Sequence, residues 1–233
     1  MKSLISLGLW ITGIATFLVI FLILAVSLVA CPRETTFSLA RRLFSIQIRL
    51  MGIRLKVEGR AHIDPDRTYL IMGNHQSLFD LFVIPAAIPL TFTGVEAAYH
   101  FKLPVWGHLI RKWGCIPIRR GNLEQAKKSL EQARTTLNEG LSIAILPEGH
   151  RTRTGELGEF KKGPFHLAKA TRAMILPFGI SGLYAFQQRG GFHLAPGKVY
   201  VRIDAPIPYD SYKDLSVEEL RDRVFEIIQR LSK

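Results

Sequence analysis

Residues 69–80 of the chain read Tyr-Leu-Ile-Met-Gly-Asn-His-Gln-Ser-Leu-Phe-Asp, an apolar run followed by a polar cluster. Its first five residues form an apolar run of the length of a buried strand. The polar residues that follow include His75 and, five positions later, Asp80. Histidine is the side chain best suited to accept a proton near neutral pH, and a carboxylate beside it fixes its tautomer. The stretch therefore predicts a strand that ends at a candidate His–Asp catalytic pair.

The spacing of this pair restricts the local structure. On a continuous α-helix, residues five apart lie roughly 140° from each other around the axis, so His75 and Asp80 would not meet. They can meet if His75 precedes a helix and Asp80 lies in its first turn. Ser77-x-x-Asp80 is typical of a capping box, which would start such a helix. The alternative is that Asp80 only caps backbone N–H groups and that His75 is a loop histidine.

The N-terminal segment is strongly apolar. Residues 3–32 contain no charged side chain. As a helix, Leu4–Ala30 would be about 40 Å long, enough to cross a hydrocarbon core of about 30 Å with tilt. Gly8 and Gly13 could instead favour a bent hairpin within one leaflet. We expect residues 1–33 to be a membrane anchor, and both the spanning and the monotopic arrangement stay open.

Two other interpretations of the N-terminus compete with an anchor. A cleaved signal peptide has an apolar core of about 7–15 residues, much shorter than this one. Leu28-Val29-Ala30-Cys31 is similar to a bacterial lipoprotein box, which would place a lipidated Cys31 outside the cytoplasm. However, one basic residue precedes the apolar run and five arginines follow it within residues 33–54. The positive-inside rule therefore predicts a protein of the cytoplasmic (inner) membrane whose body faces the cytoplasm.

The charge of the chain is strongly basic. It carries a formal net charge of +12, of which only Lys2 and Arg33 lie in the predicted anchor, so the remainder carries +10. A basic body beside a membrane favours anionic headgroups, an acidic carrier or a phosphorylated substrate. We find no zinc-finger spacing or RNA-binding aromatic signature, so nucleic acid is not expected as a partner. Residues 34–54 form a basic amphipathic stretch, predicted to be an interfacial helix, with a core-packing helix as the alternative.

Beyond the anchor, strand-like and helical segments alternate. Apolar residues at helical spacing run from Leu123 to Leu137, and a second such helix starts at Ser216 with Glu219 in the reciprocal capping position. This alternation predicts one α/β domain over residues 55–233. The predicted strands are Leu55–Glu58, Thr68–Met72, Thr91–Ala97, Cys115–Ile118, Ser142–Leu146, Met174–Ile180 and Val199–Ile203.

Two further motifs stand at strand ends, where the sites of α/β sheets gather. Arg119 and Arg120 end one apolar strand, and a guanidinium suits bidentate phosphate binding. Pro147-Glu148-Gly149 and Arg151 follow another strand, where a glycine lets backbone N–H groups approach an anion. Taken alone, each motif is more often a solvated polar turn.

Taken in order, these segments resemble the glycerolipid acyltransferase family typified by 1-acylglycerol-3-phosphate acyltransferase. The resemblance extends from about Lys56 to Ile203. The family's Asn-His-x-Ser-x-x-Asp motif matches at Asn74, His75, Ser77 and Asp80. Its Gly-x-x-Phe-Ile-x-Arg motif matches at Gly114, Ile118 and Arg120. Its Phe-Pro-Glu-Gly-Thr-Arg-Ser motif matches at Pro147, Glu148, Gly149 and Arg151.

The resemblance implies a fold and a reaction. The fold is a mixed, largely parallel sheet flanked by helices, with an N-terminal membrane helix. The reaction moves an acyl group from acyl carrier protein or coenzyme A to the free hydroxyl of 1-acylglycerol-3-phosphate, with no cofactor and no metal. His75 would remove the hydroxyl proton and Asp80 would orient His75. The implied substrate-binding residues are Asn74, Ser77, Arg120, Glu148, Gly149 and Arg151.

Within that set the implied roles differ. Arg120 and Arg151 would bind the acceptor phosphate, and Glu148 would position basic side chains or a substrate hydroxyl. Backbone N–H groups near the helix start or at the Glu148-Gly149 turn would hold the tetrahedral oxyanion.

The chain also departs from the family pattern. Many members carry a Lys-Lys-Glu-Leu-like run where this chain reads Ala97-Ala98-Tyr99-His100, and His150 replaces a threonine. If those charges hold an acceptor headgroup, the acceptor differs from lysophosphatidic acid. The alternatives are a lyso-ornithine lipid, another lysophospholipid or glycerol-3-phosphate as acceptor. A catalytically silent lipid-binding membrane protein is a further alternative, against which the intact His75 and Asp80 argue.

Overall fold

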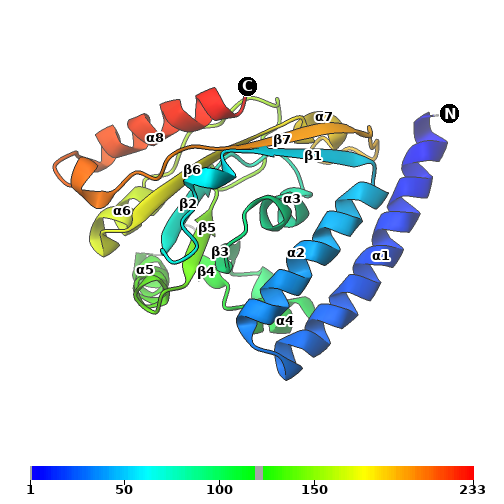
Figure 1. The fold of residues 1–233 in the computed structure, drawn as a ribbon, viewed down its shortest axis with the longest axis horizontal. Coiled ribbons are helices and arrows are strands. Elements are labelled where there is room, and N and C mark those ends of the chain that lie inside the picture. Colours follow the sequence, from blue (N-terminus) through cyan, green and yellow to red (C-terminus); the bar gives the residue numbers. More distant parts are fainter. Residues whose placement is uncertain (1, 119–122) are drawn as a thin grey trace.

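The computed structural model describes residues 2–118 and 123–233. Within these residues, strands form a seven-stranded sheet in the order β1-β7-β6-β2-β5-β3-β4 (Figure 1). All seven predicted strands are confirmed, with ends that differ by one or two residues. Their bounds are β1 (Ile53–Glu58), β2 (Tyr69–Gly73), β3 (Phe92–Ala97), β4 (Ile116–Ile118), β5 (Ser142–Ile145), β6 (Met174–Ser181) and β7 (Gly197–Ile203).

The sheet is mixed and largely parallel, as the resemblance implied. β2 pairs in parallel with β5 and β6, β3 with β5 and β4, and β1 with β7, while β6 and β7 are antiparallel. Because parallel strands end at one edge, the C-terminal ends of β2, β5 and β3 come together. The predicted catalytic motif follows β2 at this edge.

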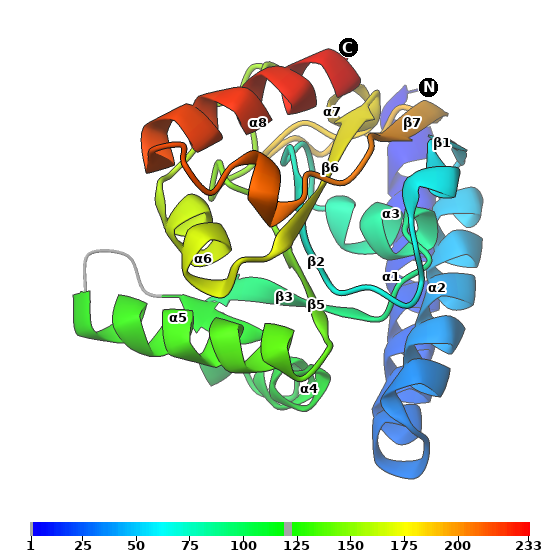
Figure 2. The same ribbon diagram turned by 60° about the vertical axis from the view of Figure 1, so that its left-hand side comes forward.

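Helices cover both faces of the sheet (Figure 2). One apolar cluster joins the sheet to α1 (Lys2–Ala30), α2 (Arg33–Leu50), α3 (Asp80–Ala87) and the short α7 (Leu183–Phe186). The other cluster joins the opposite face to α5 (Leu123–Asn138), α6 (Gly163–Thr171) and α8 (Val217–Leu231). The amphipathic α4 (Trp106–Trp113) packs near α1, and the ring centroids of Trp106 and Phe21 lie 6.5 Å apart.

Local signals explain where some helices begin. Ser216 Oγ accepts the N–H of Glu219 at 3.1 Å, and the Glu219 carboxylate accepts the N–H of Ser216 at 2.6 Å. This is the capping box that the sequence predicts, and it starts α8. The C-terminal end of α5 is marked by Gly140, which has a positive φ of 83°. Glycine adopts this conformation without strain.

α1 is one unbroken helix of 29 residues that lies alongside α2 (Figure 1). No bend occurs at Gly8 or Gly13. Gln47 Nε2 donates to the Gly13 carbonyl oxygen at 2.9 Å. A Cβ on Gly13 would lie 2.5 Å from Met51 Sδ, so a larger residue at this position would have to displace the buried Met51 side chain.

One side of α1 is docked on the domain along the helix. Buried residues recur every seven positions, the spacing of a helix–helix seam. The apolar face of α2 likewise packs on the core, through Phe37 and Phe44 among others, which is the core-packing alternative for this helix. The buried heptad residues of α1 are Ser6, Gly13, Ile20 and Ser27.

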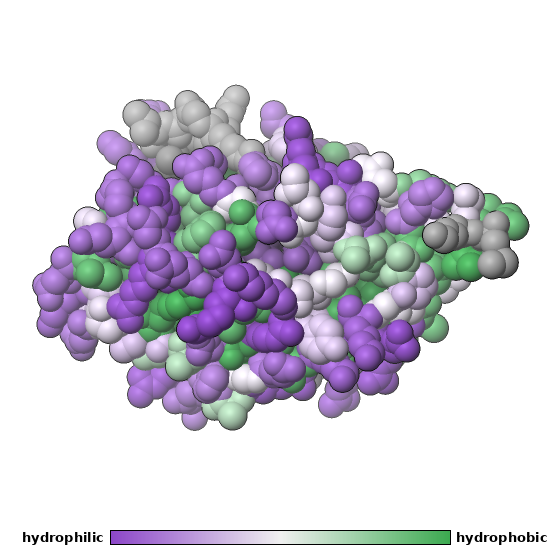
Figure 3. Space-filling model, turned by 90° about the horizontal axis from the view of Figure 1, so that it is seen from above, coloured by the Kyte–Doolittle hydropathy of each residue, from purple (hydrophilic) through white to green (hydrophobic). Residues whose placement is uncertain are grey.

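The other side of α1 is apolar and exposed. Residues Ser3–Ala30 have a mean hydropathy of 2.8 and form a helix long and apolar enough to cross a membrane. Figure 3 shows an apolar surface at the end of the molecule where α1 lies, whereas most of the remaining visible surface is polar. The exposed apolar side chains include Leu4, Leu7, Ile11, Ile14, Leu18, Leu22, Val26 and Val29.

Candidate active site

His75 and Asp80 contact each other directly after β2. β2 ends at Gly73 and α3 begins at Asp80, so the histidine precedes the helix and the aspartate lies in its first turn. His75 Nδ1 lies 2.5 Å from Asp80 Oδ2. With Nδ1–H donating to the carboxylate, the basic atom of the neutral imidazole is Nε2. The structure therefore brings the two residues together in the way that their spacing allowed.

The surroundings of the two side chains differ. The Asp80 side chain is 3% exposed and that of His75 is 26% exposed. Asp80 Oδ2 also accepts the backbone N–H groups of Gln76 at 2.9 Å and Ser77 at 3.1 Å. Asp80 Oδ1 is buried and has no hydrogen-bond partner among the described residues. The buried Asp80 carboxylate thus holds the backbone of the loop between β2 and α3, and the His75 imidazole is partly exposed to solvent.

The capping box predicted at Ser77 does not form. The residue in the N-cap position of α3 is Phe79, and no side chain caps this helix. Ser77 Oγ instead donates to Gln187 Oε1 at 2.8 Å. Only the reciprocal half of the box exists, since Asp80 accepts the Ser77 N–H. The missing half is the contact of the Asp80 N–H with the Ser77 hydroxyl, because that hydroxyl is turned toward Gln187 and the Asp80 N–H donates to the Ser77 carbonyl oxygen at 3.3 Å instead.

Glu148, which follows β5, holds the backbone of the catalytic histidine. Its Oε1 accepts the His75 N–H at 2.7 Å and its Oε2 accepts the Gly158 N–H at 2.8 Å. Burial raises the pKa of this carboxyl, and the two backbone N–H bonds oppose the shift. Among the described residues Glu148 makes these two backbone contacts and no ion pair, and its expected role toward Arg120 stays a prediction, because Arg120 lies outside those residues.

The loop after Glu148 completes this hold. Thr152 N–H donates to the His75 carbonyl oxygen at 2.8 Å, so both peptide groups of His75 are fixed by the segment that follows β5. Gly149 has a φ of 68° and its N–H donates to the Leu146 carbonyl oxygen at 2.9 Å, closing a turn. Arg151 is half-buried in this loop, between Gly149 and Thr152, and its carbonyl oxygen accepts from Arg189.

Three backbone amides lie in the two regions where the oxyanion was expected to bind, and all three are engaged within the protein. The Gln76 and Ser77 N–H groups donate to Asp80, and the Gly149 N–H donates to Leu146. They shape the loops around His75 in this structure and do not point to a free oxyanion hole.

Two of the predicted substrate-binding residues turn inward. Asn74 is 3% exposed; its Nδ2 donates to the Ile180 carbonyl oxygen at 2.8 Å and its Oδ1 accepts the Ile180 N–H at 2.7 Å. Ser77 is fully buried. Both residues fasten the catalytic loop to the segment that includes β6 and α7. The predicted phosphate ligand Arg120 lies outside the described residues.

Two buried glutamines were not identified from the sequence. Gln76 Oε1 accepts the N–H groups of Leu183 and Tyr184, both at 3.1 Å, and Gln187 accepts from Ser77. These partners lie more than 100 residues from the motif, and a lone glutamine carries no local signal. Beside them, the ring centroids of Phe79 and Phe186 lie 4.8 Å apart.

The described residues contain no group of three or more His, Cys, Asp or Glu side chains that could hold a metal ion. The groups that the described part of the site offers are the His75 imidazole and the Asp80 and Glu148 carboxylates. An exposed imidazole with a buried carboxylate on its far nitrogen is an arrangement suited to removing a proton from a substrate hydroxyl.

Comparison with known proteins identifies where such a site occurs. The family model described as Acyltransferase matches residues 54–181. The 1-acyl-sn-glycerol-3-phosphate acyltransferase alpha of Ovis aries is 32% identical over 190 residues, which are 78% of this chain and 64% of that protein. The 1-acyl-sn-glycerol-3-phosphate acyltransferase of Limnanthes douglasii is 32% identical over 178 residues, 76% of this chain and 62% of that protein. The chain thus spans a little under two thirds of these relatives.

A solved structure agrees over nearly the whole chain. The crystal structure of the 1-acyl-sn-glycerophosphate (LPA) acyltransferase PlsC from Thermotoga maritima superposes with a TM-score of 0.85 at 25% identity, covering 99% of this chain and 95% of that one. The matched family segment contains β2, His75, Asp80 and Glu148. By fold, by sequence and by the residues at its sheet edge, the chain belongs to the acyltransferase family.

Proposed function

We propose that this protein is a membrane-bound 1-acylglycerol-3-phosphate O-acyltransferase. It transfers a fatty acyl group from an acyl thioester, acyl-ACP or acyl-CoA, to the free hydroxyl of 1-acylglycerol-3-phosphate and so makes phosphatidic acid. The observation that carries the proposal is the 2.5 Å contact between His75 Nδ1 and Asp80 Oδ2, with the imidazole partly exposed. The names of the two relatives and of the solved structure support the choice of substrate.

The proposed reaction uses the imidazole twice. His75 Nε2 removes the proton of the acceptor hydroxyl as its oxygen attacks the thioester carbonyl carbon. Asp80 stabilises the imidazolium through Nδ1–H. When the tetrahedral intermediate collapses, the carbon–sulfur bond breaks and the imidazolium proton goes to the departing thiolate. The products are the acylated lipid and the free carrier thiol, and the histidine is regenerated.

The remaining site residues act around this step. Glu148 and Thr152 hold the two peptide groups of His75, which keeps Nε2 in place. Arg151 is proposed to bind the acceptor phosphate, and Arg120 to act with it. Both acyl carriers are acidic, and the basic body of the protein favours their encounter.

The membrane placement follows from α1. We propose that its exposed apolar side lies in the cytoplasmic membrane and that the domain faces the cytoplasm. Because the other side of α1 is docked along the domain through Gly13 and Ile20, a helix lying in one leaflet fits this packing better than a free spanning helix. Such a position brings the site to a lipid acceptor that itself resides in the bilayer.

Acyl transfer by the purified, detergent-solubilised protein tests the proposal. A labelled acyl thioester on either carrier is offered with lysophosphatidic acid, other lysolipids and glycerol-3-phosphate. Preference for lysophosphatidic acid, lost in His75→Ala, supports the proposed function. Activity on another acceptor alone would change the assigned acceptor and leave the proposed acyl-transfer mechanism in place. Absence of transfer to every acceptor with both carriers would favour a silent lipid-binding protein.

A further inference from the structure

α1 makes polar contacts with a loop that lies far away in the sequence. This α7–β7 loop comprises residues 187–196, between the end of α7 and the start of β7. Trp10 Nε1 donates to the Phe192 carbonyl oxygen at 2.7 Å, and Ser6 Oγ accepts the Leu194 N–H at 3.0 Å. Both partners in the loop are backbone groups. The two contacts therefore hold the path of the loop itself.

The α7–β7 loop is in turn bound to the catalytic loop, residues 74–79 between β2 and α3. Gln187 Oε1 accepts from Ser77 Oγ at 2.8 Å, and Gln187 Nε2 donates to the Gly191 carbonyl oxygen at 3.2 Å. Gln187 is 4% exposed, so its amide is held from both loops inside the protein. Ser77 lies two residues after His75. A hydrogen-bonded path thus connects the α7–β7 loop to the catalytic loop.

Aromatic rings make a second connection. The ring centroids of Trp10 and Phe79 lie 6.1 Å apart, and those of Phe79 and Phe186 lie 4.8 Å apart. Both distances are within the range of favourable aromatic pairs. Phe79 is 3% exposed and is followed directly by Asp80, the first residue of α3. The Trp10 ring therefore packs against the residue that precedes the catalytic aspartate.

The contacts of Trp10 are not those that an anchor requires. An anchor helix needs apolar side chains toward lipid, and the exposed side of α1 supplies them. Trp10 instead directs the only hydrogen-bond donor of its side chain at a carbonyl oxygen of the domain. Because an indole combines this donor with a large apolar ring, one side chain makes both connections.

We propose that Trp10 is a positioning residue of the active site and that α1 supports the catalytic loop through it. The hydrogen bond to Phe192 holds the α7–β7 loop, and the packing on Phe79 holds the start of α3. Together they keep His75 and Asp80 in contact. The inference rests on the proposed function, because its kinetic test measures acyl transfer, and Trp10 moves no proton in that reaction.

Trp10→Ala removes both connections. We expect kcat for acyl transfer in detergent to fall about tenfold or more per folded protein, because a misplacement of about 1 Å costs up to about a hundredfold in rate. The KM values of acceptor and donor should stay within about twofold of the wild type, since the variant loses positioning and no substrate contact. An unchanged kcat, or a change confined to KM, would overturn the inference.

Two further variants separate positioning from the general docking of α1. Trp10→Phe keeps a ring against Phe79 and loses only the N–H, so its kcat should return to within about threefold of the wild type. Phe21→Ala is the matched control, because Phe21 is also an aromatic residue of α1 and pairs with Phe17 and Trp106, outside both loops. It should keep kcat within about twofold. An equal fall of kcat in Phe21→Ala and Trp10→Ala would overturn the inference.

Hydrogen exchange of backbone amides needs no turnover and separates this inference from the proposed function. In Trp10→Ala, residues 74–80 and the α7–β7 loop should exchange several-fold faster than in the wild type, whereas α8, which packs on the opposite face of the sheet, should keep its rate. In Trp10→Phe, only the α7–β7 loop should exchange faster. This pattern supports the inference even if the wild type transfers no acyl group. Unchanged exchange of residues 74–80 in Trp10→Ala, or an equal acceleration in α8, would overturn it.

Discussion

Glu148 Oε1 lies 2.7 Å from the backbone nitrogen of His75, a residue 73 positions earlier in the chain. The carboxylate therefore acts on the catalytic histidine through its main chain, and its other oxygen is held by the Gly158 N–H. These two contacts form a clamp between Glu148 and the backbone of His75 and Gly158. A Cβ on Gly158 would lie 2.9 Å from Glu148 Oε2, so the clamp also explains a glycine at this position.

Glu148→Gln should weaken this clamp. The glutamine oxygen can accept one N–H, but its NH₂ group would face the second N–H donor. We expect a loss of about 1–3 kcal/mol in the free energy of unfolding and a fall in kcat with little change in KM. Chemical denaturation and steady-state kinetics measure the two effects. Retention of both values would show that the clamp is dispensable.

Glu148 also predicts a pH dependence of stability. Its pKa in the folded protein is raised above the ordinary value of 4.5 by burial. A raised pKa means that the contribution of this group is fully present below about pH 4.5 and is lost as the pH rises through the folded pKa. The free energy of unfolding of Glu148→Gln, relative to that of the wild type, should therefore rise as the pH increases through the folded pKa of Glu148. Denaturation curves from pH 4 upward check this, and a constant difference would contradict it.

Asp80→Asn should impair turnover more than folding. An asparagine NH₂ in place of Oδ2 would donate to Nδ1 and stabilise the wrong tautomer of His75. We expect kcat to fall about 10²–10⁴-fold with acceptor binding preserved. His108→Ala, at an exposed position on α4, is the control and should keep wild-type kcat. Comparable activity in Asp80→Asn would remove the aspartate from the mechanism.

The hydrogen bond between Ser77 and Gln187 should appear as an energetic coupling. Both side chains are buried and their oxygens are 2.8 Å apart. In a double-mutant cycle of Ser77→Ala and Gln187→Ala, we expect a coupling of about 1 kcal/mol in the free energy of unfolding. Strict additivity of the two substitutions would show that the contact contributes nothing.

The seam between α1 and α2 can be tested with two glycines of one helix. Gly13→Leu places atoms where Met51 is fully buried, so we expect a loss of about 1–3 kcal/mol and faster proteolysis between the helices. Gly8→Leu is the matched control, because nothing lies within 4 Å of a Cβ there. Equal stability of the two variants in the same detergent would contradict the docked position of α1.

The two cysteines should differ sharply in reactivity. Cys31 is exposed at the turn after α1, whereas burial raises the pKa of the Cys115 thiol to about 11. Since the thiolate is the reactive form, a maleimide at pH 7.5 should modify Cys31 within minutes and Cys115 only after denaturation. Labelling from each side of sealed vesicles also reports where the turn after α1 lies.

Local patterns in the sequence account for most of the fold. The seven apolar runs became strands, and the Ser216–Glu219 pair caps α8, because these features depend on neighbours within a few residues. The contact between His75 and Asp80 could also be predicted, since two residues five apart can meet here only if His75 precedes the helix and Asp80 lies in its first turn. The seven-residue spacing of the buried residues in α1 is also present in the sequence. It is hard to recognise there, because the whole segment is apolar and the small residues Gly13 and Ser27 do not stand out.

The support around His75 could not be predicted, because it depends on contacts between distant segments. Asn74 and Ile180 are 106 residues apart, and Gln187 is 110 residues from Ser77. Nothing near Asn74 indicates that a strand far along the chain will use its amide. The same reason explains why the two backbone N–H groups that Glu148 accepts could not be predicted.

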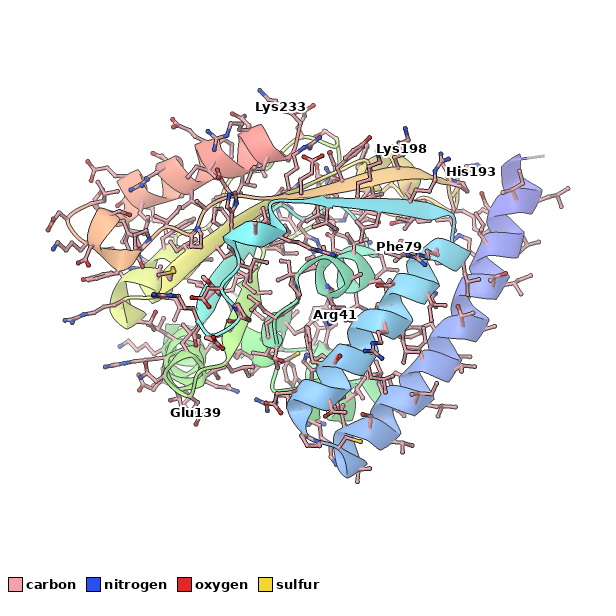
Figure 4. The ribbon with its side chains drawn as sticks, viewed as in Figure 1. Arg41, Phe79, Glu139, His193, Lys198 and Lys233 are labelled. Carbon is pink, nitrogen blue, oxygen red and sulfur yellow. The ribbon has the colours of Figure 1, made fainter. Side chains whose placement is uncertain are left out.

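The docking of α1 sets an order of events during synthesis. Ser6 Oγ accepts the N–H of Leu194, and Trp10 Nε1 donates to the Phe192 carbonyl oxygen at 2.7 Å, next to His193, which is labelled at the upper right of Figure 4. These partners are more than 180 residues away, so a ribosome adding about 5–20 residues per second takes roughly 10–40 s to supply them. During that interval the apolar helix has only lipid or a chaperone to cover it. One of the first elements to be translated is thus among the last to be completed.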